Sequence, residues 1–356
     1  RRLADEPPDV LIVSAVAAAR VGGVLLDAAP NATARVLYWR EASSVVAREP
    51  RVFSAFDLLM GVFLDADVLN PSFFFQGHGG AARFVDALRD PDAPMNRPFD
   101  ARPGFAVFVS SHCDAQPRAE YIAALRNLVP LDEYGACKRD RASPHLAVIQ
   151  SLKGRHLPYS SAMQRAQRNA TTRYKFYVAI ENALAPGYAT EKLLSNALES
   201  GAVPVYLGAP DLETVLPGGP GGTREPWLVD ASAFASPAAL ADELRAIAAD
   251  PRRWASYLSW REAARRGAPL FPGAARAVRE ALDPPTSDAA FLAEPASDEP
   301  VLRDFHGDDL SRRAAAVCRL CDAQYTARIL EESRPRGKLL GARLAERAAA
   351  IATMRS

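Results

Sequence analysis

A short stretch of the chain gathers carboxylate, amide, phenol, hydroxyl and amine side chains. They are Glu181, Asn182, Tyr188, Thr190, Glu191 and Lys192. A lysine at the start of a helix attracts anions, and the free N–H groups of the first helical turn add to this attraction. A glutamate at the same place accepts hydrogen bonds from the hydroxyls of a sugar or a ribose. The residue types therefore indicate a site for an anionic ligand that carries hydroxyl groups.

The sequence around these residues predicts one βαβ unit. Residues 174–180 form a short, apolar, β-rich run, as expected of a buried strand. Thr190 stands at the N-cap position of a helix over residues 191–198, and Gly201 ends this helix. Residues 202–207 form a second buried strand. We expect a parallel sheet with the polar residues at the carboxyl ends of its strands, where open α/β sheets bind ligands.

The residues alone leave a second interpretation open, in which Thr190 and Glu191 only cap a helix and Lys192 is a solvated surface residue. A longer pattern favours the first interpretation. The string E-N-x5-Y-x-T-E-K-x3-N-A-L-x-x-G-x-V-P-V-x-L-G, which ends at Gly208, resembles the GDP-fucose-binding signature of the family-10 α1,3/α1,4-fucosyltransferases. The length and order of the match make it far more specific than a lone glycine motif.

This resemblance implies an α/β fold of the GT-B type, in which two Rossmann-like domains face each other across a cleft. The corresponding division of the chain is an N-terminal acceptor-side domain over residues 1–150, a GDP-fucose-binding domain over residues 151–290 and a helical tail over residues 291–356. The implied reaction is inverting transfer of fucose from GDP-fucose to a hydroxyl of a glycan or glycoprotein, with O3 of GlcNAc as the expected acceptor atom. No cofactor is required.

The resemblance also gives the polar residues individual roles. Lys192 would neutralise the departing diphosphate, and the helix that opens at Thr190 would add its dipole. Asn182, Tyr188 and Glu191 would hold the nucleotide and the fucose.

A second stretch with a family resemblance surrounds Arg118, which corresponds to an arginine that contacts the donor diphosphate. A guanidinium suits phosphate oxygens because it donates two parallel hydrogen bonds. On the residues alone, Arg118 could instead pair with Glu120 or Asp114 on a solvated face. The resemblance further implies a disulfide between Cys113 and Cys137.

Transfer to a hydroxyl needs a group that accepts the hydroxyl proton, and Glu41 is the candidate base. It follows a predicted strand over residues 34–39 in the string Y-W-R-E-A-S. This string resembles the setting of the proposed base in the family, although Ala42 stands where relatives often have serine. The alternative is a surface glutamate paired with Arg40 or Arg48.

Asp65 and Asp67 form a D-x-D pair after an apolar run, the pattern with which metal-dependent glycosyltransferases of another fold hold their nucleotide. A three-residue motif with one free position arises easily by chance, and the resembling family works without a metal. We therefore predict no metal site at this pair.

Composition and charge exclude some classes of partner. The 356 residues include 43 basic and 42 acidic ones, and 49% are hydrophobic. This composition is that of a globular protein with room for two domains. A net charge of +1 gives no sign of a nucleic-acid surface or a polybasic membrane patch. An anion must therefore be bound by a local site rather than by the overall field.

Cysteines and sequons, together with the resemblance, favour the secretory pathway. Sequons begin at Asn31 and Asn169. An even number of cysteines allows three pairings if all are bridged, and the last two resemble a C-terminal CxxC of the family. The cysteines are Cys113, Cys137, Cys318 and Cys321. We expect the lumenal domain of a Golgi type II membrane protein, whose membrane span is absent from this chain.

Other elements follow from hydrophobic periodicity. Residues 71–104 are rich in Pro, Gly and Asp and are predicted to be mostly loop. Strands are predicted over residues 10–13, 34–39, 56–60, 106–109 and 227–230, and helices over residues 119–128, 237–249 and 251–264.

Two other functions fit the same fold: a non-catalytic glycan-binding or assembly protein, and a transferase that uses another nucleotide sugar. The joint presence of Glu41, Arg118 and Lys192 favours an enzyme, because a decayed enzyme would be expected to lose one of them. The long E-N-x5-Y-x-T-E-K string favours GDP-fucose as the donor.

Overall fold

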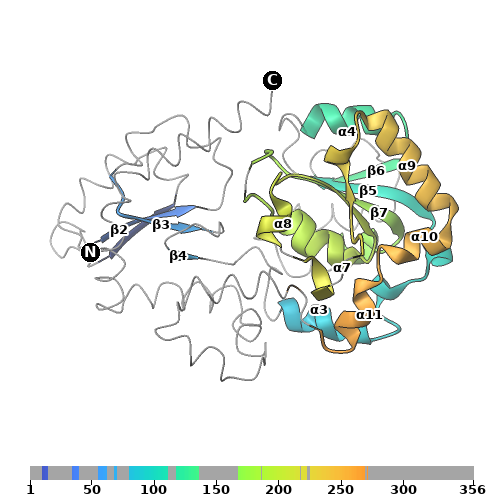
Figure 1. Ribbon diagram of the computed structural model, residues 1–356, viewed down its shortest axis with the longest axis horizontal. Helices are drawn as coiled ribbons and strands as arrows, with labels where there is room; N and C mark the ends of the chain where they lie inside the picture. Colours follow the sequence, from blue (N-terminus) through green and yellow to red (C-terminus); the bar gives the residue numbers. More distant parts are fainter. Residues whose placement is uncertain are drawn as a thin grey trace, which may run out of the picture.

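The computed structural model contains two parallel β-sheets (Figure 1). It describes residues 10–14, 34–39, 55–61, 68–69, 80–110, 118–135, 167–185, 187–216, 218–222, 225–268 and 271. None of the helices in these ranges is long and apolar enough to cross a membrane.

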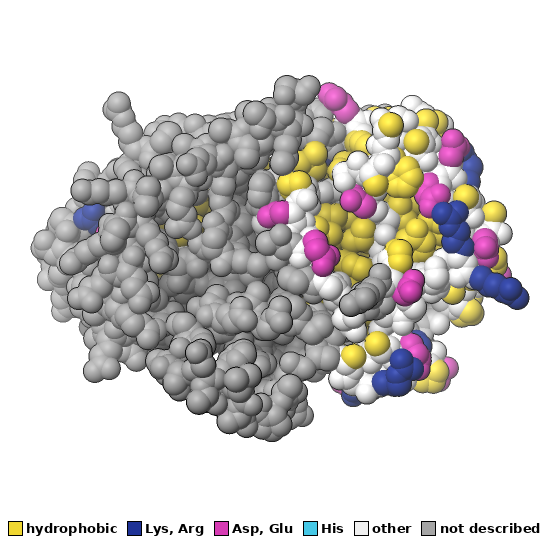
Figure 2. Space-filling model, in the orientation of Figure 1, with side chains coloured by type: hydrophobic (Ala, Val, Ile, Leu, Met, Phe, Trp, Pro, Cys, Tyr) yellow, Lys and Arg dark blue, Asp and Glu magenta, His cyan; other side chains and the backbone are white. Residues whose placement is uncertain are grey.

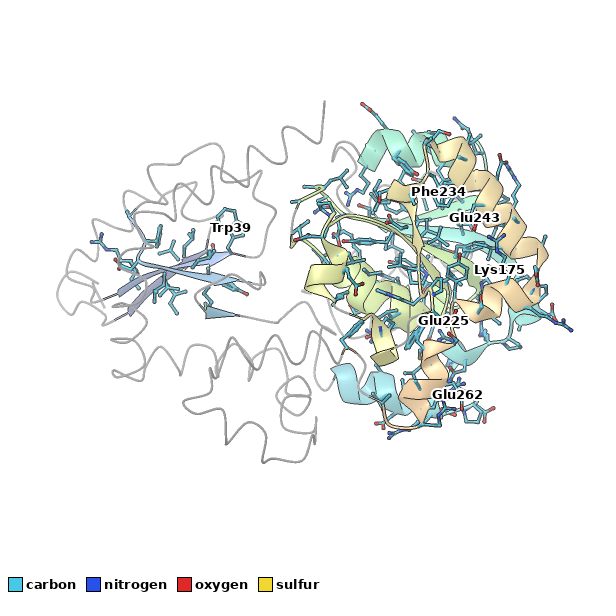
Figure 3. The ribbon with its side chains drawn as sticks, viewed as in Figure 1. Trp39, Lys175, Glu225, Phe234, Glu243 and Glu262 are labelled. Carbon is cyan, nitrogen blue, oxygen red and sulfur yellow. The ribbon has the colours of Figure 1, made fainter. Side chains whose placement is uncertain are left out.

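The first sheet has the strand order β1-β2-β3-β4, and each pair of neighbours is parallel. Val36 and Leu37 of β2 point to opposite faces and are both fully buried, so both faces of this strand are covered. Trp39, labelled in Figure 3, is buried at the carboxyl end of the same strand. The predicted strands in this region are confirmed. They are β1 (Val10–Ser14), β2 (Ala34–Trp39), β3 (Leu58–Gly61) and β4 (Val68–Leu69), of which the two-residue β4 lies outside the predicted strands.

The second sheet has five parallel strands in the order β6-β5-β7-β8-β9. The chain moves outward from β5 to β6 and then returns to place β7 on the other side of β5. The strand order therefore reverses between β5 and β7. The strands are β5 (Gly104–Ser110), β6 (Leu131–Gly135), β7 (Tyr174–Ile180), β8 (Val203–Leu207) and β9 (Val229–Asp230).

The predicted domain boundary at residue 150 is wrong for this sheet, because it falls between two of its strands. β5 pairs with β7 from Gly104 opposite Tyr174 onward, and the N–H of Gly104 donates to the carbonyl of Arg173 at 3.0 Å. The predicted strand over residues 106–109 thus belongs to the second sheet and not to the first. The polar, arginine-rich segment between β6 and β7 has the composition of a linker, but composition does not reveal which strands it joins.

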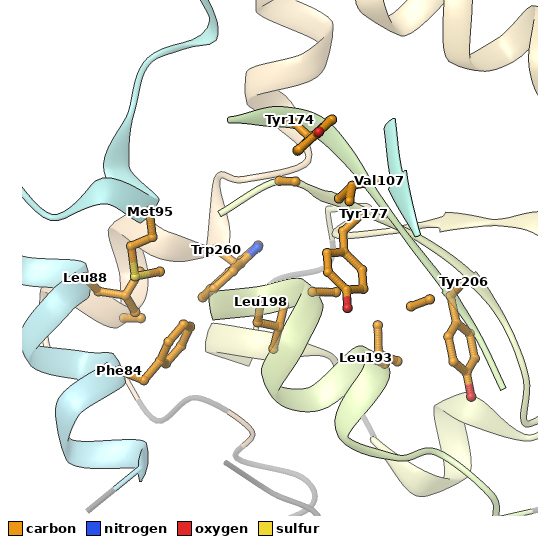
Figure 4. Close-up of a cluster of buried hydrophobic side chains, with 14 of the residues drawn as sticks. Phe84, Leu88, Met95, Val107, Tyr174, Tyr177, Leu193, Leu198, Tyr206 and Trp260 are labelled. Atoms are coloured by element: carbon orange, nitrogen blue, oxygen red, sulfur yellow. The ribbon is translucent and has the colours of Figure 1, made fainter. Parts of the chain in front are cut away.

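Helices cover both faces of the second sheet. Side chains alternate along β7, so that Tyr177 and Ala179 pack into one hydrophobic cluster and Phe176 and Val178 into another. The first cluster is covered by α3 (Gly80–Arg89), η4 (Lys192–Ala197), α7 (Leu198–Ser200) and α11 (Trp260–Arg265). The second is covered by α4 (Arg118–Arg126), α9 (Pro237–Ala249) and α10 (Pro251–Ser256). Figure 4 shows Trp260 in the first cluster, between Phe84 and Leu198.

One predicted loop and one predicted helix differ from the elements that the structure shows. Within the predicted loop over residues 71–104, residues 80–89 form the helix α3, because Phe84 and Leu88 lie one turn apart and are both buried. The predicted helix over residues 251–264 is divided into α10 and α11. Trp254 and Trp260 therefore enter the clusters on opposite faces of the sheet.

A buried arginine, Arg102, donates hydrogen bonds to backbone carbonyls from distant parts of the chain. Arg102 is fully buried, and its guanidinium also lies 5.4 Å from the ring centre of Trp254. Its N–H groups donate to the backbone carbonyls of Met95 (2.7 Å), Thr172 (2.9 Å), Arg97 and Tyr174 (3.0 Å each) and Ser200 (3.3 Å). Burial and the charge of Arg97 lower the pKa of Arg102 to about 9, so the group stays charged at neutral pH.

Gly201 ends the helix α7 beside this arginine and leaves no room for a side chain. Its φ is +71°, and a Cβ there would lie 2.0 Å from the carbonyl oxygen of Met95 and 2.7 Å from Nη2 of Arg102. Gly201→Ala is therefore expected to lower the free energy of unfolding by about 3 kcal/mol, through backbone strain and a clash that only a backbone shift relieves. Urea unfolding measures the loss.

Gly218→Ala is the matched control, because Gly218 has a φ of +72° with nothing within 4 Å of its would-be Cβ. It should cost only the strain of the left-handed conformation, about 1 kcal/mol. Equal losses in the two variants would contradict the close approach at Gly201.

Candidate functional site

The predicted site residues lie where the strand order of the second sheet reverses. Arg118 begins α4, the helix after β5, and Glu181 and Asn182 directly follow β7. Because β5 and β7 are parallel neighbours, both connections leave the same carboxyl edge of the sheet. In open α/β sheets this reversal opens the crevice that binds ligands. The topology therefore places the candidate residues at the expected position for a ligand.

Lys192 is held by three acceptors at the start of its helix. Its Nζ lies 3.0 Å from Oγ1 of Thr190, 3.3 Å from Oε2 of Glu181 and 3.3 Å from Oε1 of Glu191. Only 13% of its side chain is exposed, so the interpretation of Lys192 as a solvated surface residue is wrong. Burial by itself lowers the pKa of Lys192, but the carboxylates of Glu181 and Glu191 outweigh it and raise the pKa above its ordinary value.

Glu181 is the buried centre of this cluster. It is fully buried, and its Oε1 accepts the N–H of Thr190 at 2.7 Å, while the hydroxyl of Thr190 donates to its Oε2 at 2.7 Å. Burial raises the pKa of Glu181, and the nearby charge of Lys192 opposes this effect. Glu181 is one of the polar residues that indicate a site in the sequence, but the resemblance gave it no individual role. Its signal in the sequence was a carboxylate that directly follows a buried strand.

Arg118 is the second cation of the site. Only 2% of the residue is exposed, and its guanidinium lies 5.8 Å from the ring centre of Phe108. Its Nη1 donates to Oδ1 of Asn182, which joins the connection after β5 to the connection after β7. Burial lowers the pKa of Arg118, while Glu181, Tyr188 and Glu191 raise it in opposition. The alternative of a solvated surface arginine is therefore excluded by its burial.

Residues of β8 and of the connection after it form hydrogen bonds with the loop that carries Tyr188. The hydroxyl of Tyr206 accepts the N–H of Ala209 at 2.8 Å and donates to the carbonyl of Tyr188 at 3.5 Å. Oδ1 of Asp211 accepts the N–H of Gly187 at 2.7 Å. Tyr188 itself is 2% exposed. Tyr206 and Asp211 were not predicted as site residues, because their partners lie on another connection of the chain.

The helix of the site differs from the predicted α-helix. Residues 192–197 form the π-helix η4, which continues into α7. The predicted N-cap at Thr190 is weak, because the backbone N–H of Lys192 donates to Oγ1 of Thr190 at the long distance of 3.4 Å. The hydroxyl of Ser195 instead donates to the carbonyl of Glu191 at 3.2 Å. π-helical turns are rare and concentrate at functional sites.

The structure thus brings together all six predicted donor-site residues: Arg118, Asn182, Tyr188, Thr190, Glu191 and Lys192. Asn169 is exposed, whereas Thr171 of its sequon is buried and donates to the carbonyl of Arg168 at 2.9 Å. The other predicted positions lie outside the described residues. They are Asn31, Glu41, Asp65, Asp67, Cys113, Cys137, Cys318 and Cys321.

The site combines charged side chains of both signs. The buried Arg118 and the largely buried Lys192 are its cations, and Glu181 and Glu191 are its carboxylates. In the part of the chain that the structure describes, no three His, Cys, Asp or Glu side chains are grouped so that they could hold a metal ion. On the described part of the visible face, Asp and Glu side chains are spread widely, while Lys and Arg side chains lie mainly toward its outer edge (Figure 2). The net charge of the chain is only +1, so attraction of an anion has to be local.

The fold and the site define an α/β protein with two cations, Arg118 and Lys192, where the strand order reverses in a parallel sheet that is covered on both faces. Residues 100–274 match the family model "Glycosyltransferase family 10 (fucosyltransferase) C-term", and this segment of the chain belongs to that family. The matched segment begins just before β5 and includes every described residue of the site.

Curated relatives carry the same family relation. GDP-fucose protein O-fucosyltransferase 3 of Bos taurus is 34% identical over 157 residues, which cover 44% of this chain and 29% of that protein. Alpha-(1,3)-fucosyltransferase B of Drosophila melanogaster is 32% identical over 154 residues, covering 42% of this chain and 31% of that protein. The enzyme 3-galactosyl-N-acetylglucosaminide 4-alpha-L-fucosyltransferase FUT3 of Pongo pygmaeus is 30% identical over 210 residues, covering 58% and 46%. The chain thus spans less than half the length of these curated relatives.

A solved structure of an α1,3-fucosyltransferase with GDP aligns with 83% of this chain and 96% of its own, at 16% sequence identity and a TM-score of 0.44.

Proposed function

We propose that this protein is an inverting fucosyltransferase that moves fucose from GDP-fucose to a hydroxyl of a glycan or glycoprotein. The observation that carries the proposal is the presence of two cations, the buried Arg118 and the largely buried Lys192, at the reversal point of the sheet and inside the segment that matches family 10. Two cations at this edge suit a diphosphate, the part of the donor that gains charge as the glycosidic bond breaks.

The donor is held by groups with distinct tasks. The guanidinium of Arg118 and the ammonium of Lys192 neutralise the leaving diphosphate. Tyr188 and Glu191 hold the nucleotide and the fucose. The amide oxygen of Asn182 accepts from Arg118, so its first task in the reaction is to orient that guanidinium, and its NH₂ group can donate to the donor substrate.

The acceptor side rests on residues of the N-terminal part. We propose Glu41 as the base that takes the proton of the acceptor hydroxyl, with O3 of GlcNAc as the acceptor atom. The first sheet would belong to the domain that carries this base, and the two sheets would face each other across the cleft of a GT-B enzyme. The relatives include a protein O-fucosyltransferase and α1,3- and α1,4-fucosyltransferases, so the class of acceptor differs among them.

Location and cofactor requirements complete the proposal. The protein would work in the Golgi lumen as the lumenal domain of a type II membrane protein, with disulfides Cys113–Cys137 and Cys318–Cys321 and glycans at Asn31 and Asn169. GDP-fucose is the donor substrate and no cofactor takes part.

Release of GDP from GDP-fucose in the presence of acceptors tests the function. The acceptors should include GlcNAc-terminated glycans, Lewis-type chains and folded glycoproteins. We expect acceptor-dependent GDP release, and an α-fucoside in the product by proton NMR, because inversion of the β-linked donor gives the α-linkage. A protein that binds GDP-fucose but releases no GDP with any acceptor would instead be a binding protein on the same fold.

A further inference from the structure

The ammonium of Lys192 has no spare N–H group before the donor arrives. Three acceptors surround it within 3.3 Å, namely Thr190, Glu181 and Glu191, and a lysine ammonium has three N–H groups. A diphosphate that binds to Lys192 must therefore replace one of these acceptors or share an N–H group with it.

Two of the three acceptors are fixed by the fold. Glu181 is fully buried, and both of its carboxylate oxygens are bonded to Thr190. Thr190 is 1% exposed. The packing behind Glu181 is also closed, because a Cβ on Gly208 would lie 2.7 Å from its Cγ. Neither group can move away without breaking a buried hydrogen-bond network, which costs free energy.

Glu191 differs from these two acceptors, because 29% of its side chain is exposed and its carboxylate can turn toward solvent or a ligand. We propose that Glu181 is the positioning residue that holds Lys192 in place for the donor diphosphate, and that Glu191 is the carboxylate which the diphosphate displaces from Lys192. This inference rests on the proposed function. It assigns Glu181 no contact with the donor.

The exchange has a consequence for charge. A diphosphate that displaces Glu191 leaves the ammonium between two anions, the phosphate and Glu181. Glu191 is then free to accept hydrogen bonds from hydroxyls of the donor. One carboxylate thus keeps Lys192 charged throughout, and the other changes partners when the donor binds.

The test is the pH dependence of GDP binding to the full chain, measured by calorimetry between pH 6 and 11 for the wild type, Glu181→Gln and Glu191→Gln. Removal of the charge of Glu181 leaves a mostly buried ammonium with less support, which lowers the pKa of Lys192. Binding by Glu181→Gln should therefore fail at a lower pH than binding by the wild type. Its affinity at pH 7 should fall about tenfold or more, as is usual when a buried orienting partner is removed.

The pH limit above which GDP binding is lost should shift less in Glu191→Gln than in Glu181→Gln, because the partly exposed Glu191 supports the charge of Lys192 less than the fully buried Glu181 does. Glu199→Gln is the matched control, since it breaks another ion pair of the same helical segment, with Arg168 at 2.9 Å. It should leave the limit unchanged. A wild-type limit and affinity in Glu181→Gln, or a larger shift in Glu191→Gln, would overturn the inference.

A second measurement decides the matter if Glu181→Gln does not fold. The ¹³Cε resonance of Lys192 in the free wild-type protein, assigned by its absence in Lys192→Arg, should titrate above 10.5. A titration at or below this value would overturn the pairing. This measurement needs no ligand, so wild-type protein that binds no GDP would refute the proposed function while the role of Glu181 is still tested.

Discussion

Lys192→Gln is expected to slow fucosyl transfer from GDP-fucose by a factor of about 10² to 10³, the usual cost of removing one group that stabilises charge in a transition state. Glutamine removes the charge but keeps an N–H donor for Glu181, which would otherwise be a buried carboxylate without its partner. The loss should appear in kcat more than in KM, because the charge on the diphosphate grows as the bond to fucose breaks. Steady-state kinetics over a range of GDP-fucose concentrations measure the split.

Arg118→Lys is the companion variant for the second cation. Lysine keeps the charge but loses the planar fork that donates to Asn182 and that, in the proposed function, also binds phosphate. Its rate should fall less than that of Lys192→Gln. Thermal unfolding of both variants controls for damage to the fold. A Lys192→Gln enzyme that is folded and transfers fucose at the wild-type rate would remove Lys192 from the mechanism.

Arg102→Met should cause the largest loss of stability, at least about 4 kcal/mol. The substitution leaves several buried carbonyls without their donor, at about 1–3 kcal/mol for each unsatisfied group. Arg102 donates to carbonyls from five residues, and the Met95 carbonyl also accepts from Nη1 of Arg261 at 3.3 Å. Urea unfolding measures the loss, and such a loss can prevent folding at 37 °C because domains are stable by only about 5–15 kcal/mol.

Arg245→Met is the matched control on the surface. The side chain of Arg245 is 50% exposed, pairs with Asp242 and donates to the carbonyl of Leu128. Its removal should cost less than about 1 kcal/mol. If Arg102→Met lost no more stability than Arg245→Met, the buried arginine would not be the tie between strand ends and helix that its contacts indicate.

The strands of the protein could be predicted because both sheets are parallel and covered on both faces. Such strands are apolar throughout, and β7 was predicted with the limits that the structure shows. Strand partners could not be predicted in the same way. Nothing in the residues of β5 says that it pairs with β7, which begins 64 residues after β5 ends. The predicted domain boundary failed for this reason.

The sequence predicted which residues gather at the site, but not the contacts that they make with one another. The E-N-x5-Y-x-T-E-K string identifies residues that the fold gathers at one edge. The burial of Glu181 depends on Gly208 and the approach of Tyr206 from the next strand, since a Cβ on Gly208 would lie 2.2 Å from the Tyr206 hydroxyl. These are contacts between distant parts of the chain. The hydrophobic spacing around Lys192 also does not reveal the π-helix. Its hydrogen bonds span only one residue more than those of an α-helix, which is too small a difference to show over six residues.

Calorimetric titration of the purified chain with GDP-fucose, GDP-mannose and UDP-galactose, each with EDTA and with Mn²⁺, tests the central claim most directly. We predict selective binding of GDP-fucose that is unchanged by EDTA, because the proposed function assigns neutralisation of the diphosphate to Arg118 and Lys192 and not to a metal ion. A folded protein that binds no GDP-fucose would contradict the donor site. Binding that requires Mn²⁺ would contradict the metal-free mechanism and return attention to Asp65 and Asp67.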